Sequence, residues 1–417
     1  MATLTEVTDA DYPAITVPGI VYLDGYYFVM TPAGRIYNSA INDPTSWNAL
    51  EFIQCQAETD SGVAIARISN YVVGFSQYTI EFFYDAGNPT GSPLLPMTSA
   101  QANIGCACGQ SVVNTDGTIL FIGQSKHFGR GVYLLNGTNP QKVSTPFIDR
   151  ILDAADMIDV WAFTVKPGGH SFYVLVLGGS VNRTIVYDLA TQEWHEWDML
   201  EAGRSYEITA LSHVNGVATA TCAGHPFADG DLVTIAGADQ EGYNIQTNIT
   251  YIDVNSFSYV VAVATETPAT TSGRLTATGY TRTNFAGAFA SEYNGYSIIQ
   301  TRSGGAVYYF KAGVYQDNDL PIDVRIRTSK FDAQSNKKKF FNSVAVLGDK
   351  VQSSALLRYT DDDYVTWSKY RPINLALDRS KVSRLGSGRR RAFELRHNAN
   401  TEFRAEALEI DLDEGVS

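Results

Sequence analysis

The chain has 417 residues, with 44 acidic and 31 basic side chains and a formal net charge of −13. This length exceeds one ordinary hydrophobic core, and the negative charge argues against a nucleic-acid-binding protein of the usual basic kind. The 24 tyrosines and 20 phenylalanines, with few charges, are typical of strands that pack on both faces.

The N-terminal segment, residues 1–20, is polar, contains Pro13 and Pro18, and is predicted to form an arm or a closing strand. It has neither the basic segment nor the apolar run of a secretory signal. No stretch of the chain approaches the ~18 apolar residues of a transmembrane helix. We therefore expect a protein made in a cytoplasm and soluble there.

A repeated hairpin organises the chain. Asp24 and Gly25 form a turn dipeptide, Tyr26–Met30 is a strand of aromatic and β-branched residues, and a second turn leads into a partner strand at 35–37. The same pattern recurs at residues 71–75 with 79–83, 118–122 with 131–134, 171–175 with 184–187, and 296–299 with 306–309. The first four repeats are about 45 to 53 residues apart, a period typical of propeller blades. The fifth follows after about 125 residues, which leaves room for a small inserted domain.

The sequence therefore predicts an all-β fold: a β-propeller of about six blades, complete or incomplete, with an inserted small β-barrel or sandwich module and a C-terminal β region. The predicted parts are an arm at 1–20, the first part of the propeller at 21–205, the inserted module at 206–279, and the second part of the propeller with the C-terminal β region at 280–417. The strands of the C-terminal third are compatible with a sixth blade, a closing sheet or a separate sandwich.

Three local features carry further expectations. Trp47 follows an Asp-Pro turn and is expected to fill the gap between neighbouring blades. The convincing helix candidate is short and acidic and spans residues 149–156. Residues 322–327 alternate strictly between apolar and charged side chains, which predicts a strand with one buried face and one charged face.

The four cysteines are Cys55, Cys106, Cys108 and Cys222. They form no disulfide framework for a chain of this size, and the pair at 106 and 108 lacks a matching His or Cys pair for zinc. We interpret all four as small buried thiols, and we expect no metal site.

Residues 360–367 resemble the Asp-box turn of sialidases and related propellers, with Thr360 in place of Ser and Tyr364 in place of Gly. That turn is a folding element and gives no support to catalysis. The carboxylates of Asp361, Asp362 and Asp363 are able to hold Ca²⁺, but a solvated acidic loop is the favoured interpretation.

No motif identifies an active site. The six histidines are scattered, the glycine patterns of nucleotide-binding and hydrolase folds are absent, and nothing pairs two of the carboxylates around a sugar. We therefore predict no enzymatic activity, no catalytic residues and no cofactor.

Two basic runs stand out in this acidic chain. One comprises Lys337, Lys338 and Lys339, and the other comprises Arg389, Arg390 and Arg391 with Arg384 and Arg396 nearby. Solvated loops and subunit contacts are the default interpretation. The more specific interpretation is contact with DNA phosphates, which such charges attract only at short range under physiological salt.

Several motifs occur in an order that is informative as a set. They are residues 34–39 with Asp43, Pro44 and Trp47, residues 78–83, 104–106 and 147–152, and, more loosely, 357–362, Trp367 and 384–389. This order resembles the tail-nozzle (tail hub, packaged-DNA stabilisation) proteins of short-tailed bacteriophages. The inserted segment departs from a minimal nozzle, and its residues 225–235 look like a small β module common in phage tail and fibre proteins.

The resemblance implies a structural virion protein in the phage tail, assembled in the host cytoplasm as a ring of six copies below the head-to-tail adaptor. That ring would extend the channel by which DNA leaves the capsid. The implied partners are further copies of the chain, the adaptor protein, tail fibre, spike or plug proteins, and viral DNA in passage, without membrane insertion. Two alternatives remain: a carbohydrate-active propeller of the sialidase or depolymerase kind, and a receptor-binding tail protein that acts through the insert.

Overall fold

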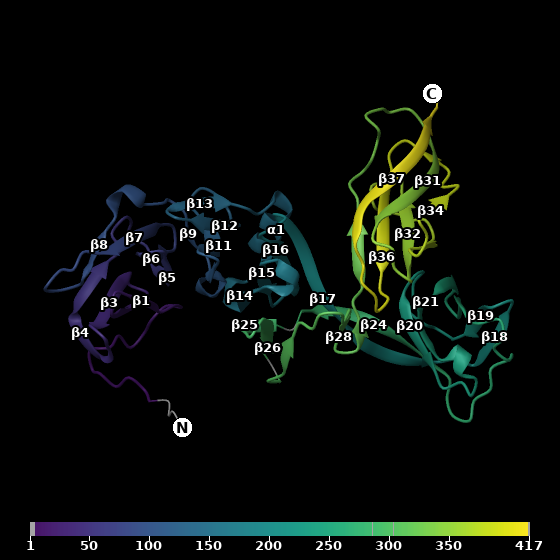
Figure 1. Ribbon diagram of the computed structural model, residues 1–417, viewed down its shortest axis with the longest axis horizontal. Coiled ribbons are helices and arrows are strands. Elements are labelled where there is room, and N and C mark those ends of the chain that lie inside the picture. Colours follow the sequence, from purple (N-terminus) through teal and green to yellow (C-terminus); the bar gives the residue numbers. More distant parts are fainter. Residues whose placement is uncertain (1–4, 286, 303, 416–417) are drawn as a thin grey trace. The chain divides into compact units, whose positions relative to one another are not determined.

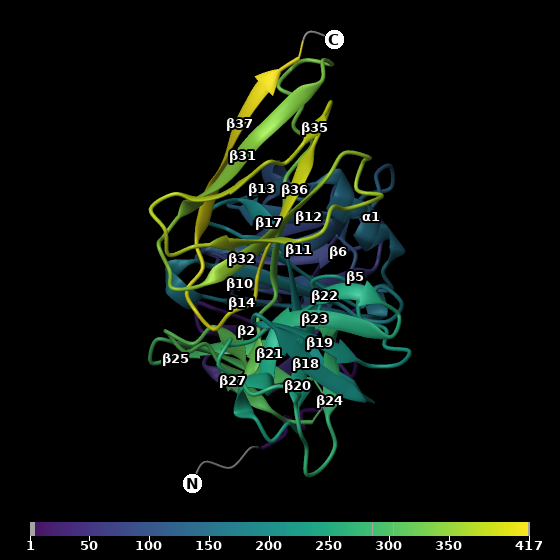
Figure 2. The same cartoon turned by 90° about the vertical axis from the view of Figure 1, so that its right-hand side faces the viewer.

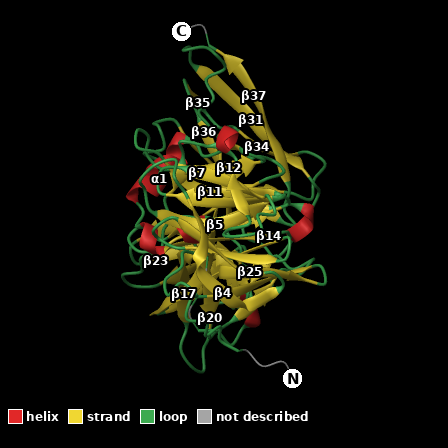
Figure 3. Ribbon diagram, turned by 90° about the vertical axis from the view of Figure 1, so that its left-hand side faces the viewer, coloured by secondary structure: helices red, strands yellow, loops and turns green. Residues whose placement is uncertain are grey.

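The computed structural model describes residues 5–285, 287–302 and 304–415, and strands dominate its regular structure (Figure 3). The chain divides into two compact units. Unit 1 is Met1–Asp198 with Asn284–Phe310, and unit 2 is Met199–Thr283 with Lys311–Ser417. The all-β prediction is confirmed. Within the described ranges, no helix has the length and apolar character needed to span a bilayer.

Unit 1 contains five antiparallel sheets among the described residues (Figure 1). Sheet 1 comprises β1 (Val21–Leu23), β2 (Tyr26–Met30), β3 (Arg35–Ala40) and β4 (Asp43–Gln54). Sheet 2 comprises β5 (Gly62–Ile68), β6 (Tyr71–Ser76), β7 (Ile80–Asp85) and β8 (Leu94–Pro96). Sheet 3 comprises β9 (Gly105–Cys106), β10 (Val113–Thr115), β11 (Thr118–Gln124), β12 (Gly131–Asn136) and β13 (Asn139–Lys142).

Sheet 4 comprises β14 (Val160–Val165), β15 (Phe172–Leu177), β16 (Arg183–Asp188) and the first part of β17 (Glu193–Glu207). Sheet 5 has three strands, β25 (Gly287–Tyr293), β26 (Tyr296–Thr301) and β27 (Val307–Tyr309). The five predicted hairpins supply two adjacent strands in each of these sheets. The chain enters unit 2 within β17 and returns within β24.

Turn chemistry explains where the hairpins reverse. Asp24, Asp116 and Asn294 are each followed by a glycine, and both residues of each pair have positive φ. Positive φ at both central residues is the type I′ turn, whose twist matches that of paired strands. The printed sequence therefore determines these reversals locally.

Alternation along the central strands explains how the sheets stack. Val72 and Phe83 of sheet 2 pack with sheet 1, whereas Val73 and Phe82 pack with sheet 3. In sheet 4, Leu175 faces the core shared with sheet 3, and Val174 faces the core shared with sheet 5. Because successive side chains point to opposite faces, a strand between two sheets must be apolar on both.

The short helix α1 (Pro146–Ala154) begins three residues earlier and ends two residues earlier than the predicted helix at 149–156. The Thr145 hydroxyl accepts a hydrogen bond from the backbone N–H of Ile148, and Pro146 occupies the first turn. Its apolar side buries Ile148 and Leu152 in the core between sheets 3 and 4.

Trp47 does not lie between blades, so that expectation is wrong. Its ring makes an edge contact with Tyr12 at 5.0 Å, and its backbone N–H donates to Asp9 at 3.0 Å. The arm continues along sheets 1 and 2, where Val17 donates to Met30 and Ile65 donates to Pro18. Trp47 thus holds the N-terminal arm against its own sheet.

The inserted module of unit 2 has two sheets around one core. One comprises β18 (Ala210–Val214), β19 (Val217–Thr221), β23 (Ser256–Val260) and β22 (Thr250–Asp253). The other contains β24 (Thr276–Asn284), β20 (Leu232–Ala236) and β21 (Ile245–Asn248). Phe257, Val233 and Tyr243 lie in the shared core, so the module is a small sandwich.

The C-terminal region of unit 2 is a second sandwich (Figure 2). One sheet orders β30 (Val324–Arg327), β36 (Ala392–His397), β32 (Ser354–Thr360) and β33 (Arg371–Asn374). The other contains β34 (Ser380–Ser383), β31 (Lys339–Gly348), β35 (Ser387–Gly388) and β37 (Ala405–Glu414). A short hairpin, β28 (Gln316–Asp317) with β29 (Leu320–Pro321), precedes them. Phe341, Leu357 and Phe393 fill a core of its own, which distinguishes a separate sandwich from a sixth blade.

Candidate functional site

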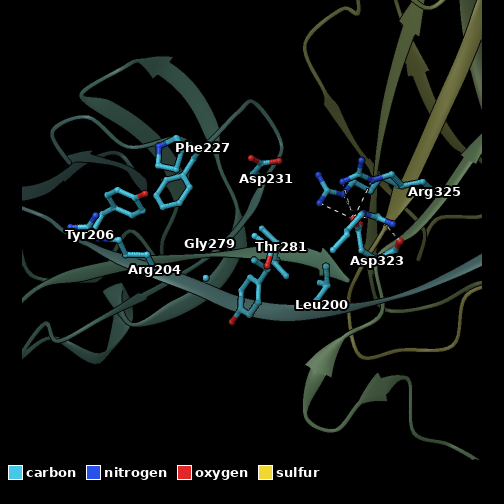
Figure 4. A pocket seen from close by; sticks show the side chains of 15 residues that line it. Leu200, Arg204, Tyr206, Phe227, Asp231, Gly279, Thr281, Asp323 and Arg325 are labelled. Carbon is cyan, nitrogen blue, oxygen red and sulfur yellow. Dashed lines mark hydrogen bonds and ion pairs between the residues drawn. The ribbon is translucent and has the colours of Figure 1, made fainter. Parts of the chain in front are cut away.

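A pocket of about 450 Å³ lies in unit 2, where the inserted module meets the C-terminal sandwich (Figure 4). Its charged and aromatic lining residues are Arg204, Tyr206, Phe227, Asp231, Tyr280, Arg282, Asp323, Arg325 and Arg396. Figure 4 shows Tyr206 and Phe227 at one end of the pocket and Asp323 with Arg325 at the other. The pocket therefore has an aromatic end and an arginine end.

Asp323 is the centre of the arginine end. The Nε and Nη2 of Arg396 donate to its two carboxylate oxygens at 2.6 and 3.0 Å, and the Nε of Arg325 donates at 3.1 Å. Arg282 pairs with the same carboxylate. The Asp323 side chain is 1 % exposed. Burial alone would raise the pKa of Asp323, but the bonds from Arg396 and the charges of Arg325 and Arg282 lower it below its ordinary value.

The side chain of Arg325 forms fewer hydrogen bonds than that of Arg396. Its Nε and Nη2 both approach Oδ2 of Asp323, and no acceptor in the described part of the chain lies within hydrogen-bonding distance of its Nη1. Burial and the neighbouring charge of Arg396 lower the pKa of Arg325. A guanidinium stays charged in proteins, so this end of the pocket favours a further anionic partner.

A turn of the inserted module docks on the C-terminal sandwich beside this network. The Nη1 of Arg396 donates to the carbonyl of Gly230, and the backbone N–H of Tyr370 donates to Asp229 at 3.3 Å. Gly230 has a φ of +80°, and a Cβ there would lie 2.2 Å from the Tyr370 ring. Only glycine fits this position, so the contact is built into the sequence of the turn.

A second buried carboxylate, Glu394, lies on the same strand as Arg396. It accepts from the Nε of Arg358 at 2.7 Å and pairs with Arg327 and the Tyr370 hydroxyl. Burial would raise the pKa of Glu394, but the bond from Arg358 and those from Tyr370 and Arg327 lower it. Burial and the bond to Glu394 raise the pKa of Tyr370 to about 12. Both carboxylates are thus ionised and surrounded by arginines.

The sequence did not indicate this site. The alternation at 322–327 predicted buried isoleucines and a charged solvent face, but Asp323 is buried, whereas Ile322 and Ile326 are 39 and 41 % exposed. Asp323 is buried because Arg396 and Arg282, far away in sequence, meet it there. Arg325 and Arg327 on the same face stay exposed. A buried ionic face gives the same period-2 pattern as a solvated one, so only long-range contacts distinguish the two.

The two predicted basic runs lie side by side. Lys339 pairs with Gly388 across β31 and β35, and the Nη1 of Arg389 donates to the Asn336 carbonyl at 2.6 Å. The exposed members are Lys337, Lys338, Arg384, Arg389 and Arg390. Residues about 50 positions apart therefore form one basic patch on the C-terminal sandwich.

Two members of these runs belong to the interior, which corrects their proposed role, and Arg396 beside the second run is likewise buried against Asp323. Lys339 is fully buried, and its Nζ donates to the carbonyls of Ser335, Lys337 and Arg389. Arg391 is 1 % exposed and pairs with both oxygens of Asp361 at 2.8 and 2.7 Å. Its guanidinium also lies 3.8 Å from the Tyr359 ring centroid. These partners leave neither side chain available for DNA or a second subunit.

The turn at Asp361, Asp362 and Asp363 joins β32 to β33 in the C-terminal sandwich, so it belongs to no propeller blade. Each carboxylate has a different partner. Asp361 binds Arg391, Asp362 accepts from Thr366 and Thr360, and Asp363 pairs with Lys330. Within the described ranges, no group of three or more His, Cys, Asp or Glu side chains is arranged to hold a metal ion.

The four cysteines are buried free thiols, as interpreted from the sequence. Burial raises the pKa of Cys106 to about 12 and also raises that of Cys222. Thiols of this kind are poor nucleophiles at neutral pH because the thiolate is the reactive form.

The comparison with protein families identifies the chain's lineage. The family described as "Bacteriophage P22 Gp10, beta-propeller" matches residues 1–226, just over half of the sequence. The chain belongs to this family. It is a structural protein of the bacteriophage tail, and unit 1 is its β-propeller. The resemblance based on the ordered motifs is therefore confirmed at the level of the family.

Other comparisons are distant. No curated protein matches the sequence. Among solved structures, BamB from Moraxella catarrhalis has 12 % identity and a TM-score of 0.31, with 70 % of this chain and 84 % of that chain covered. The exo-beta-1,3-galactanase from Phanerochaete chrysosporium with galactose has 9 % identity and a TM-score of 0.27, with 97 % of each chain covered. Neither likeness bears on function at these scores.

Proposed function

We propose that this chain forms the tail nozzle, a ring of six copies that extends the DNA-exit channel below the head-to-tail adaptor and helps to retain and eject packaged DNA. The observation that carries the proposal is the family match over residues 1–226. That match includes the first four sheets of unit 1, which form a continuous series of packed cores. The stacked sheets suit a rigid structural wall.

The charge of the chain supports a conduit. A channel that lets a polyanion pass should not neutralise its phosphates, because released counterions would make DNA adhere. A formal net charge of −13 per copy disfavours such adhesion. The exposed basic patch is the exception, and we propose that it contacts DNA or a neighbouring copy at a defined place.

The proposed partners are further copies of the chain, the adaptor protein, and tail fibre, spike or plug proteins. Viral DNA would be a transient partner. We propose a purely structural role for this virion component, without catalysis or a cofactor and without membrane insertion, and assembly in the host cytoplasm.

Negative-stain electron microscopy of the full chain, alone and with an adaptor–portal complex, tests this proposal. We expect rings with an axial hole, or monomers that assemble only on the adaptor. A chain that stays monomeric and ignores the adaptor–portal complex would rule the nozzle out.

Charge reversal tests the basic patch separately. The double variant Lys338→Glu with Arg390→Glu should fold normally, because both side chains are exposed, and should weaken ring assembly or DNA retention. Lys350→Glu is the matched control, since Lys350 is exposed and lies outside both basic runs. Equal behaviour of the two variants would remove the patch from the proposal and leave the ring untouched.

A further inference from the structure

The pocket in unit 2 combines three features that a ring assembly does not explain. It is large enough for a small ligand, since binding pockets are typically about 300–1,000 Å³, and this one measures about 450 Å³. It is cationic at one end and aromatic at the other. All of its lining residues belong to unit 2.

Two glycines line one side of the pocket and leave space there. Gly203 and Gly279 lie on adjacent stretches of β17 and β24, and both line the pocket. A Cβ at Gly279 would lie 2.6 Å from the Phe227 ring, so a larger residue would displace that ring. The absence of side chains here leaves space beside the aromatic wall.

The aromatic wall is ordered. Tyr206 meets Phe227 edge-on at 5.5 Å, and Phe227 stacks on the buried His225 at 5.2 Å. Arg204 lies 5.6 Å from the Tyr206 ring centroid and forms no ion pair with any described residue. Flat apolar faces with a cation beside them suit a ring-shaped ligand that carries negative charge.

The arginine end supplies the recognition of an anion. The buried Asp323 carboxylate fixes Arg396 and Arg325, so their guanidinium groups are already in place before a ligand arrives. The Nη1 of Arg325 has donors that no described residue accepts. Charge-assisted bonds from a guanidinium to a carboxylate are among the stronger hydrogen bonds in proteins.

Between the two ends lies Asp231 (Figure 4). One of its carboxylate oxygens accepts from the backbone N–H of Ala228 at 2.8 Å, which holds the side chain in position. A carboxylate can only accept hydrogen bonds, so Asp231 selects hydroxyl groups on a ligand and repels a second negative charge.

We propose that this pocket binds an acidic oligosaccharide, with the carboxylate of one hexuronate unit on Arg325, hydroxyls toward Asp231 and the ring of another unit against Tyr206 and Phe227. The ligand class is a short segment of an acidic polysaccharide that contains hexuronate, because the two ends of the pocket are too far apart for one sugar. The site concerns unit 2 alone and does not depend on ring formation, so it extends beyond the proposed nozzle role.

Calorimetric titration of the full chain at low ionic strength tests the proposal with three probes: a trisaccharide that contains glucuronate, the same trisaccharide with its carboxylate reduced to an alcohol, and inorganic phosphate. The acidic trisaccharide should bind with a Kd of about 0.1–1 mM, and the other two probes should each bind at least about tenfold more weakly. Equal binding of the reduced trisaccharide would show that the arginines are not used, and equal binding of phosphate would show that the site recognises charge alone. Either result, or no binding of the acidic trisaccharide, overturns the proposal.

Substitutions locate the binding. Arg325→Gln should weaken binding of the acidic trisaccharide about tenfold or more, because it removes one charge-assisted contact. Since Arg325 also contacts the buried Asp323, the exposed Arg204→Gln is a second variant that does not disturb that network, and it should weaken binding severalfold. Arg274→Gln is the control: it is exposed, pairs with Glu207 in the same module and lies outside the pocket. Unchanged binding in a folded Arg204→Gln and Arg325→Gln would place the ligand elsewhere and reject the assignment.

Discussion

Buried charge is the unusual feature of unit 2 at the scale of single residues. Asp323, Glu394, Lys339 and Arg391 are all buried, and each has several polar partners. Removing an ion from water costs several kcal/mol, and the cost is offset only when the partners are well placed. Such networks therefore tolerate little change at any one member.

Asp323→Asn should destabilise unit 2 by about 3–5 kcal/mol, because three arginines would lose the carboxylate between them. Denaturant unfolding followed at Trp367 would measure the change. Asp378→Asn is the matched control, since that side chain is 91 % exposed and forms a surface ion pair with Lys350, and it should change little. Similar losses in both variants would contradict a special role for the buried network.

Asp362 gives a pH dependence. Hydrogen bonds from Thr366, through both its hydroxyl and its backbone N–H, and from Thr360 lower the pKa of Asp362 to about 2. A carboxylate whose folded pKa is depressed contributes stability above its unfolded pKa and loses it as the pH falls through the folded pKa. Asp362→Ala should therefore lower the melting temperature at pH 7, and the difference from the parent should shrink as the pH falls from about 4 toward 2. A difference that stays constant over that range would exclude ionisation of Asp362 as its source.

Close contact between neighbouring sheets governs the propeller at the scale of elements. Gly105 on β9 lies against the turn between β6 and β7, where a Cβ would be 2.3 Å from the Tyr78 nitrogen and 2.4 Å from the Gln77 carbonyl carbon. These are backbone atoms and cannot move aside as the end of a side chain can. Sheet 3 is thus positioned against sheet 2 by the absence of a side chain.

Gly105→Ala should destabilise unit 1 by about 1–3 kcal/mol or more, because the added methyl forces the two sheets apart. Thermal unfolding compared with the parent would show it. Gly273→Ala serves as the control, since nothing lies within 4 Å of a Cβ there. Indistinguishable melting of the two variants would mean that sheets 2 and 3 are not held this closely.

The two units have separate cores at the scale of the whole molecule. The clusters between successive sheets of unit 1 share no residue with those of the inserted module or the C-terminal sandwich. Compact units with their own cores are able to unfold separately. The cysteines report on each, because three lie in unit 1 and Cys222 lies in unit 2.

Thiol labelling should resolve the two units. In native buffer all four thiols should resist a maleimide, because burial hides them and raises their pKa. With increasing denaturant, Cys222 should become reactive at a different concentration from Cys55, Cys106 and Cys108. Mass spectrometry of the labelled peptides would measure this, and a single midpoint for all four would show that the units unfold together.

The sequence by itself determined the features that depend on neighbouring residues. The five hairpins, their turns and the two-sided apolar strands follow from turn dipeptides such as Asp24 with Gly25 and from runs such as Tyr26–Met30, because these preferences act over a few residues. The order of the motifs also sufficed to indicate the phage family. The burial of the cysteines follows from the general preference of unpaired cysteines for the interior.

Only the tertiary structure decided where charge is buried and what it meets. Asp323, Arg396 and Gly230 are far apart in sequence, and neither composition nor period shows that they converge. The sequence also cannot show that Lys339 and Arg391 are buried, because their exposed neighbours Lys338 and Arg390 are the same residue types. A charge is stabilised inside a protein only by partners brought from elsewhere in the chain, so its position becomes known once the sheets are paired.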